Sequence, residues 1–177
     1  LSAGCGQMHR FYDIPGGSAG GASDRKLPDM QAGWEQMCSN LSAGLSGVNM
    51  IYEAAGMHAS LLGFCLESLI LGDDIIGQTL RCVRGIEVND ETLALDQIAD
   101  VCMNGPGHYL GTDQTLSGMQ TNCVYPTFGS RTSPKEWLEL GKPDLIAQAT
   151  ARKEEILAMK TAAALPPEVA AAVRERF

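Results

Sequence analysis

The fold of this chain is decided by residues 48–56, which read Val48-Asn49-Met50-Ile51-Tyr52-Glu53-Ala54-Ala55-Gly56. The first five residues form a short apolar run of the kind that makes a buried strand. Residues 53–60 predict a loop, because the apolar pattern stops there and a glycine follows. The glycine-rich residues 16–24, further upstream, predict a loop or a strand followed by a loop, since glycine costs conformational entropy inside regular structure.

A helix is expected between these two segments. Pro28 suits a first helical turn, and Asp29 complements the positive end of the helix dipole. Apolar side chains then recur at helical spacing, which predicts a stripe packed on one side of the helix: Met30, Trp34, Met37, Cys38, Leu41 and Leu45. Gly47 is expected to end the helix.

A second unit follows the loop at residues 53–60. Residues 64–71 form another apolar run and predict a strand, and Asp73 and Asp74 predict the start of a helix that Gly85 closes. Helices that alternate with short buried strands imply a parallel α/β sheet or barrel. Residues 1–12 predict the end of a preceding helix.

Beyond Gly85 the strand pattern stops, and the sequence predicts helices alone. Asn89 is expected to cap the first of them, and Ser133-Pro134-Lys135-Glu136 is a capping box with proline at the first helical position. The expected helices cover residues 90–103, 112–119, 133–140, 144–159 and 167–176. The chain therefore divides into an α/β part, residues 1–85, and a helical part, residues 86–177.

Composition narrows the classes of function. The chain has 177 residues, with 21 acidic and 13 basic side chains and a formal net charge of −8. This length fits one domain or a piece of a larger one. The acidic balance argues against a nucleic-acid binder and against attachment to an anionic membrane surface, and no apolar run reaches the roughly 20 residues of a spanning helix. Residues 1–8 show no secretory leader, and because position 1 is Leu, we expect the true start to lie upstream.

Neither the cysteines nor the histidines predict a metal centre. The six cysteines include no C-x-x-C pair. In an acidic domain without a leader they are expected to be reduced, buried residues of a cytoplasmic protein. The three histidines, His9, His58 and His108, are far apart in sequence and include no H-E-x-x-H motif.

Candidate site residues follow the predicted strands, because ligands of parallel α/β proteins bind at the carboxyl ends of the strands. Glu53 comes directly after the first strand and Glu67 lies inside the second apolar run, so each is a candidate for binding a cation or moving a proton. The alternative for Glu67 is a buried acid satisfied by backbone donors or an arginine. His58 is either a site residue or a simple hydrogen-bonded loop histidine.

Two further features leave alternatives open. The glycine-rich residues 16–24 lack the spacing of phosphate-binding and dinucleotide-binding loops, so they are a flexible surface loop or a place where the backbone approaches a ligand. Tyr12, Tyr52 and Phe64 flank the glycine loops. Aromatic faces with a carboxylate hold quaternary ammonium ions, but the same rings also suit a core.

Several stretches carry a resemblance to a known family: Gly20-Gly21-Ala22-Ser23-Asp24-Arg25-Lys26-Leu27-Pro28-Asp29-Met30-Gln31-Ala32-Gly33, Tyr52-Glu53-Ala54-Ala55-Gly56-Met57, Arg84-Gly85-Ile86-Glu87-Val88-Asn89-Asp90-Glu91-Thr92-Leu93-Ala94, Gly107-His108-Tyr109-Leu110 with Thr115-Leu116, and Ser130-Arg131 with Trp137. They are similar to the trimethylamine methyltransferase family, the corrinoid-dependent methyltransferases of methylamine metabolism. The resemblance covers nearly the whole chain, and residues 85–94 are its most specific part.

The resemblance implies a (β/α)8 barrel that moves a methyl group from a methylated amine to the cobalt of a corrinoid protein. A complete barrel needs about 250 residues. Residues 1–85 would then hold the last strands and helices of a TIM-like barrel, and residues 86–177 a helical C-terminal extension. No cofactor is expected to bind this chain directly, because the partner protein would supply the corrinoid. A homo-oligomer in the cytoplasm is the expected form.

One departure from the family bears on the substrate. The founding archaeal enzymes carry a pyrrolysine in the region that aligns with residues 15–24, where this chain has only standard residues. Relatives without that residue resemble quaternary amine demethylases, for example those that act on glycine betaine. A quaternary ammonium already carries the positive charge that makes its amine a good leaving group.

The resemblance also suggests roles for the candidate residues. Tyr52 and Glu53 would cradle the ammonium group, with Glu67 and His58 near it. The loop next to the former pyrrolysine position would be shaped by Asp24, Lys26 and Gln31. The alternative is a non-catalytic interaction or regulatory module of the same fold, which would expose apolar strand edges and pair with another copy.

Overall fold

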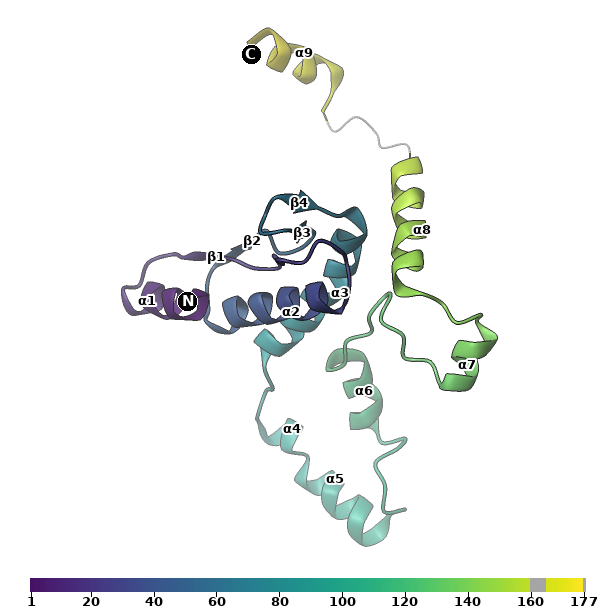
Figure 1. The fold of residues 1–177 in the computed structure, drawn as a ribbon. Coiled ribbons are helices and arrows are strands. Elements are labelled where there is room, and N and C mark those ends of the chain that lie inside the picture. The colour runs from purple at the N-terminus through teal and green to yellow at the C-terminus, as the bar shows by residue number, and fades with distance from the viewer. Residues whose placement is uncertain (160–164, 177) are drawn as a thin grey trace.

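The computed structural model describes residues 1–159 and 165–176. Figure 1 shows a small strand-and-helix unit near the N-terminus from which the remaining helices extend. In chain order the elements are α1 (Ser2–Phe11), β1 (Gly17–Ala19), α2 (Met30–Leu45), β2 (Met50–Tyr52), β3 (Met57–His58), β4 (Gly63–Phe64), α3 (Leu66–Arg84), α4 (Asp90–Leu93), α5 (Leu95–Ala99), the π-helix η1 (Asp100–Asn104), α6 (Asp113–Thr121), α7 (Pro134–Glu139), α8 (Leu145–Ala158) and α9 (Pro167–Arg176).

The centre of this unit is a β–α–β arrangement. β1 and β2 run parallel, with Gly17 opposite Met50 and Ala19 opposite Tyr52, and α2 connects them. The parallel order predicted from the sequence is therefore confirmed for this pair. Residues of one face, Ser18 and its partner Ile51, are turned toward α2. The other face carries Met50 and Tyr52, and both side chains are exposed in the part of the chain that the structure describes.

Helix α2 begins where the sequence predicts but buries a different face. The Asp29 carboxylate caps it by accepting from the backbone N–H groups of Gln31 and Ala32, and Arg25 lies 2.6 Å from the same carboxylate, which lowers its pKa. The predicted apolar stripe is largely exposed, so the expected packing is wrong. The buried residues are Ala32, Gln36, Asn40 and Ala43. Small side chains let α2 approach the strands closely, and the two amides meet backbone carbonyls that need donors.

The strand predicted at residues 64–71 is also wrong. β4 ends at Phe64, and α3 begins at once because the Cys65 sulfur accepts from the backbone N–H of Ser68 and caps the helix. Asp73 and Asp74 consequently lie inside α3 and do not start a helix. β4 pairs with β3 in an antiparallel hairpin that the sequence did not predict.

The later helices start largely where the sequence predicted them. The side chains of Thr112, Ser133 and Asp144 accept from the backbone three residues on and begin α6, α7 and α8. The helix expected over residues 90–103 is instead broken at Ala94, whose φ of +47° separates α4 from α5. Among the described residues, no helix is long and apolar enough to cross a membrane.

Two groups of hydrogen bonds tie the later helices to α3. Arg81 and Arg84, at its C-terminal end, donate to the carbonyls of Asn122 and Thr121 over 2.6 Å. Near its middle, the Asp74 carboxylate accepts from three successive backbone N–H groups of residues 127–129, over 2.6, 2.8 and 3.0 Å. The segment between α6 and α7 is therefore fastened to α3 through its own backbone.

The expected burial of the cysteines is wrong. Cys65 is half-buried, and the other five are exposed: Cys5, Cys38, Cys82, Cys102 and Cys123. The reason is the open shape of the chain, which exposes 12,917 Å² at a mass of 18.8 kDa. A compact monomer of this mass exposes about 8,300 Å². Helix faces that would be interior in a compact domain are thus uncovered.

Candidate functional site

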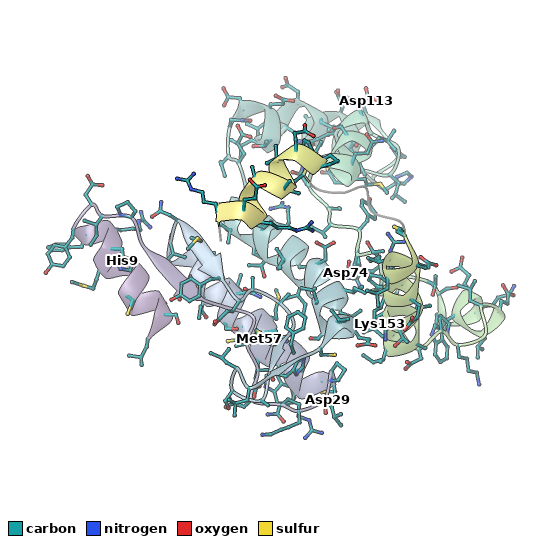
Figure 2. All side chains as sticks on the ribbon, turned by 90° about the horizontal axis from the view of Figure 1, so that it is seen from above. His9, Asp29, Met57, Asp74, Asp113 and Lys153 are labelled. Carbon is teal, nitrogen blue, oxygen red and sulfur yellow. The ribbon has the colours of Figure 1, made fainter. Side chains whose placement is uncertain are left out.

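Two loops meet at the carboxyl ends of β1 and β2. Residues 20–29 follow β1, and residues 53–56 lead from β2 into the β3–β4 hairpin. The backbone N–H of Gly20 donates to the Tyr52 carbonyl over 3.0 Å, and that of Ser23 donates to the Met57 carbonyl over 3.1 Å. In Figure 2, Met57 and Asp29 lie at the same end of the molecule, away from Asp113. The glycine-rich segment is thus a short strand followed by an ordered loop.

The contact between the loops depends on Gly21. Its φ is +67°, a backbone conformation that side chains with a Cβ disfavour. A Cβ at this position would overlap the backbone carbonyl of Ala54 in the other loop. Neither alternative for this segment included this contact: the backbone of Gly21 approaches the backbone of the other loop.

Two buried amides of α2 hold the second loop from beneath. Asn40 donates to the Ala54 carbonyl over 2.9 Å. Gln36 lies 3.5 Å from the Met57 carbonyl and donates to the Ser68 hydroxyl of α3 over 3.2 Å. Sequence reasoning missed both residues, although polar side chains four positions apart on one face of a helix are a signal for such a role.

A carboxylate that the sequence analysis missed, Glu35, organises the first loop. It accepts from the Ser23 hydroxyl over 2.5 Å, from the Gln31 side chain over 2.9 Å and from the Asp24 backbone N–H over 3.0 Å. The hydrogen bond from Ser23, followed by that from Gln31, lowers the pKa of Glu35. Gln31 therefore points to Glu35.

Asp24 joins the two loops through its side chain. Its carboxylate accepts from the Ser60 hydroxyl over 2.7 Å, and its carbonyl accepts from the Lys26 ammonium over 2.9 Å. Ser60 belongs to the turn between β3 and β4. The predicted residues Asp24 and Lys26 thus lie in this loop, and Gln31, in the first turn of α2, contacts the Glu35 carboxylate that holds it.

His58 is buried beside the same loop. Its Nδ1 lies 3.1 Å from the carbonyl of Arg25, which also accepts from the Ala59 backbone N–H over 3.0 Å. Because a carbonyl only accepts, Nδ1 is the donor in this hydrogen bond. Nε2 has no hydrogen-bond partner in the part of the chain that the structure describes.

Tyr52 and Glu53 mark the end of β2. Tyr52 lies on the strand face opposite α2 and is 47% exposed. Glu53 is exposed, its φ is +57°, and within residues 1–159 and 165–176 its carboxylate makes no hydrogen bond or ion pair. An aromatic ring and a carboxylate therefore follow one another at the carboxyl end of a parallel strand.

Glu67 is directed elsewhere. It lies in the first turn of α3, and its carboxylate accepts from the Lys153 ammonium of α8 over 2.8 Å. Figure 2 shows Lys153 on α8, next to α3. The Lys153 hydrogen bond lowers the pKa of Glu67 to about 2. The structure thus brings Asp24, Gln31 and His58 together around the loops and places Glu67 between two helices.

Acid is expected to weaken the contact between α3 and α8. The pKa of Glu67 is about 2 against an ordinary value of 4.5, so the carboxylate stabilises the folded chain above about pH 4.5 and this contribution is lost as the pH falls toward 2. Glu67→Gln should lower the midpoint of thermal unfolding by roughly 1–4 °C at pH 7, with the difference shrinking in acid. Circular dichroism melts between pH 7 and pH 2 measure this.

The matched control is Glu154→Gln. Glu154 also contacts Lys153, over 3.1 Å, but its side chain is 67% exposed, so its replacement should have a smaller effect. A melting difference between wild type and Glu67→Gln that stays the same at every pH would contradict the assignment.

A cavity of about 560 Å³ lies between α2, α3 and the start of α8. Apolar side chains dominate its walls: Met30, Trp34, Met37, Leu71, Ile75, Leu145 and Ile146. Its two carboxylates are already occupied, because Asp29 caps α2 and Asp74 binds residues 127–129. None of the predicted site residues lines it, so the loops at the strand ends remain the better candidate site.

The family model and the similar proteins that match this chain are all described as methyltransferases. The family model described as trimethylamine methyltransferase (MTTB) matches residues 1–177. Within residues 1–159 and 165–176, no group of three or more His, Cys, Asp and Glu side chains is arranged to hold a metal ion.

Similar proteins come from bacteria and archaea. Glycine betaine methyltransferase of Desulfitobacterium hafniense strain Y51 is 34% identical over 92% of this chain and 33% of its own length. Trimethylamine methyltransferase MttB of D. hafniense strain DSM 10664 / DCB-2 is 31% identical over 98% of the chain and 34% of its own length. MttB of Methanosarcina barkeri strain Fusaro / DSM 804 is 34% identical over 89% of this chain and 31% of its own length. The chain thus spans about a third of the length of these relatives.

Proposed function

Because the chain belongs to the trimethylamine methyltransferase family, we propose that it takes part in moving a methyl group from a methylated amine to a corrinoid carried by a partner protein. Within the molecule, one observation supports this most. β1 and β2 run parallel, and the loops that follow them meet where Tyr52 and Glu53 end β2. Parallel α/β proteins bind their ligands at this end of the strands.

In this proposal β1, α2, β2 and α3 are the closing part of a (β/α)8 barrel, and residues 86–177 form a helical C-terminal extension. The two faces of the strand pair support this. Helix α2 covers one face, and the other, with Met50 and Tyr52, is open as the inward face of a barrel strand would be before its neighbours are added.

The favoured substrate is a quaternary amine, because residues 15–24 hold only standard residues where the founding trimethylamine enzymes carry pyrrolysine. One of the relatives that are 34% identical is named a glycine betaine methyltransferase. When a methyl group leaves a quaternary ammonium, the C–N bonding pair stays on nitrogen and yields a neutral amine, so no proton has to be supplied to the leaving group. The partner's corrinoid supplies the nucleophile that takes the methyl group. This chain then has to hold the cation and orient one N–CH₃ bond.

Tyr52 and Glu53 are proposed to hold the ammonium group, the ring through its face and the carboxylate through its charge. His58 is proposed to lie near the ammonium group, where its buried ring contacts the Arg25 carbonyl of the first loop. Asp24 and Gln31 are proposed to position the loop, since their side chains are engaged with Ser60 and Glu35. Glu67 is proposed as a positioning residue through Lys153.

The test mixes the full-length protein with a reduced corrinoid protein and a series of tertiary and quaternary amines, and follows the visible absorption of the corrinoid. Transfer is expected from at least one quaternary amine. Glu53→Gln should lower kcat/KM for that amine by roughly tenfold to a hundredfold, the size expected when one partly desolvated charge contact is lost.

Glu91→Gln is the matched control, because Glu91 is also exposed but lies on α4. It should leave kcat/KM unchanged. If Glu53→Gln also has no effect, the role of Glu53 is wrong. If no amine reacts with a carrier of proven activity, the non-catalytic interaction module is favoured.

A further inference from the structure

One face of α2 carries polar side chains that contact the loop after β1. They recur every four residues, as neighbours on one helical face do: Gln31, Glu35 and Ser39. The Ser39 hydroxyl accepts from the backbone N–H of Gly21 over 3.1 Å. The Glu35 carboxylate accepts from the Ser23 hydroxyl and from the Asp24 backbone N–H. Helix α2 therefore binds this loop at three points.

Ser23 connects Glu35 to the β3–β4 hairpin. Ser23 is only 3% exposed, and its hydroxyl oxygen also accepts from the Arg25 backbone N–H over 2.9 Å. Its backbone N–H donates to the Met57 carbonyl over 3.1 Å, and its carbonyl accepts from the Ser60 backbone N–H over 3.3 Å. One buried serine thus makes hydrogen bonds to the helix, to its own loop and to the hairpin.

The direction of these hydrogen bonds is set at Glu35. The hydrogen bond from Ser23 lowers the pKa of Glu35, so its carboxylate is ionised at neutral pH and can only accept. Ser23 donates its one hydroxyl proton there, which leaves its oxygen to accept from Arg25. The Arg25 carbonyl in turn accepts from the Ala59 backbone N–H over 3.0 Å and lies 3.1 Å from His58 Nδ1. A short series of hydrogen bonds therefore leads from Glu35 to His58.

We propose that Glu35 is a positioning residue, which acts through Ser23 and Arg25 to set the placement of His58 and of the turn between β3 and β4. This inference rests on the proposed function, because these groups affect the reaction only if the amine binds at the carboxyl ends of β1 and β2. The Glu35 carboxylate is already engaged by three donors of the loop and of its own helix. Loss of that carboxylate leaves the buried Ser23 hydroxyl without its acceptor and allows the loop to shift.

The test compares Glu35→Ala with Glu35→Gln in the full-length protein. Alanine keeps α2 helical but removes the acceptor, so kcat/KM for a quaternary amine should fall roughly tenfold to a hundredfold, the cost of a misplaced site. Glutamine keeps an oxygen for Ser23 and should restore most of the activity. Equal losses in the two variants would overturn the inference, because they would mean that the charge of Glu35 acts directly.

Ser23→Ala breaks the same link at its other end. If Glu35 acts through Ser23, the double variant Ser23→Ala/Glu35→Ala should lose clearly less kcat/KM than the product of the two single losses. Two losses that simply multiply would overturn the inference, since the two residues would then act independently. Ser23→Ala also replaces Glu35→Ala in every assay if the latter does not fold.

Hydrogen exchange provides a measurement that does not depend on activity. In Glu35→Ala the backbone amides of Asp24, Arg25 and Ala59 should exchange faster than in wild type, because each donates within the series of hydrogen bonds that starts at Glu35. Glu136→Ala is the matched control. Glu136 is also a helical glutamate that accepts from a backbone N–H, but it lies on α7, so its replacement should change neither these amides nor kcat/KM.

The two measurements separate this inference from the proposed function. If wild type transfers no methyl group and Glu35→Ala still accelerates exchange at these amides, the proposed function fails and the role of Glu35 in placing the loops is supported. Unchanged exchange overturns the inference and leaves the proposed function intact. Faster exchange with an unchanged kcat/KM also overturns it, because the placement of the loops would then not affect the reaction.

Discussion

Gly21→Ala is expected to separate the two loops at the strand ends and to destabilise the protein by about 2–5 kcal/mol. About 1–2 kcal/mol comes from placing a Cβ on a residue at φ +67°, and about 1–3 kcal/mol from the overlap of that Cβ with the Ala54 carbonyl. The carbonyl cannot withdraw easily, because it accepts the amide hydrogen of Asn40. Urea unfolding of the purified variant measures the loss.

Gly33→Ala is the control, and it is expected to raise the free energy of unfolding where Gly21→Ala lowers it. Gly33 lies inside α2, and a Cβ there meets nothing within 4 Å. Alanine should therefore stabilise the helix, by roughly 0.5–1 kcal/mol, because it restricts the unfolded chain more than glycine does. If the two alanine variants changed the free energy of unfolding equally and in the same direction, the close approach of Gly21 to Ala54 would be disproved.

Asp74→Ala is expected to release residues 127–129 from α3 at a cost of about 2–4 kcal/mol. One carboxylate accepts from three successive backbone N–H groups. A hydrogen bond to a charged group contributes about 1.5–3 kcal/mol net, and the three that share this partly exposed carboxylate are not additive. Hydrogen exchange of the Thr127, Phe128 and Gly129 amides should accelerate more than that of other amides. Asp74→Asn should give an intermediate result, since its amide oxygen can still accept but carries no charge.

Asp73→Ala is the control for this change. Asp73 is exposed and makes no hydrogen bond with the described residues, yet its replacement alters the net charge and the helix in the same way. It should leave exchange at residues 127–129 unchanged. Equal acceleration in the two alanine variants would mean that charge, and not the contact to the loop, controls the exchange.

Helix starts could be predicted from the sequence because the interactions that define them are local. Asp29, Ser133 and Asn89 each accept from a backbone N–H two or three residues along the chain, so their residue type and position suffice. The same reasoning did not identify Cys65 as a cap, since its sulfur is a weak acceptor and the apolar residues around it resemble a strand.

Which face of a helix is buried could not be predicted in the same way. The apolar stripe of α2 predicted that Trp34 and Leu45 would be buried, yet Gln36 and Asn40 are the buried residues. Their partners are the carbonyls of Met57 in β3 and of Ala54 in the loop before it, 21 and 14 positions away. Hydrophobic periodicity depends only on how apolar each residue is. It cannot predict a buried polar residue whose hydrogen-bond partner is distant in sequence.

In the candidate site, too, the positions of residues in the chain could be predicted from local sequence, but their hydrogen-bond partners could not. Glu53 and Tyr52 could be placed at a strand end because an apolar run stops there, and Asp24 could be assigned to a loop that follows a strand. The expected loop position of His58 is wrong, because His58 lies in β3. The hydrogen-bond partners of Asp24 and His58 are Ser60 and the Arg25 carbonyl, and no local pattern links these to them. Glu67 was chosen because it interrupts an apolar run, but a lysine 86 positions later accounts for that interruption.

The two buried amides of α2 have a geometric consequence. Gln36 and Asn40 are separated by about one helical turn, which advances roughly 5.4 Å along the axis. They contact carbonyls at 57 and 54, three positions apart in the loop. The distance between the two amides on α2 must therefore match the distance between the carbonyls of residues 54 and 57, beside the proposed substrate site. Inserting a residue between 54 and 57 would leave one of the two amides without its carbonyl.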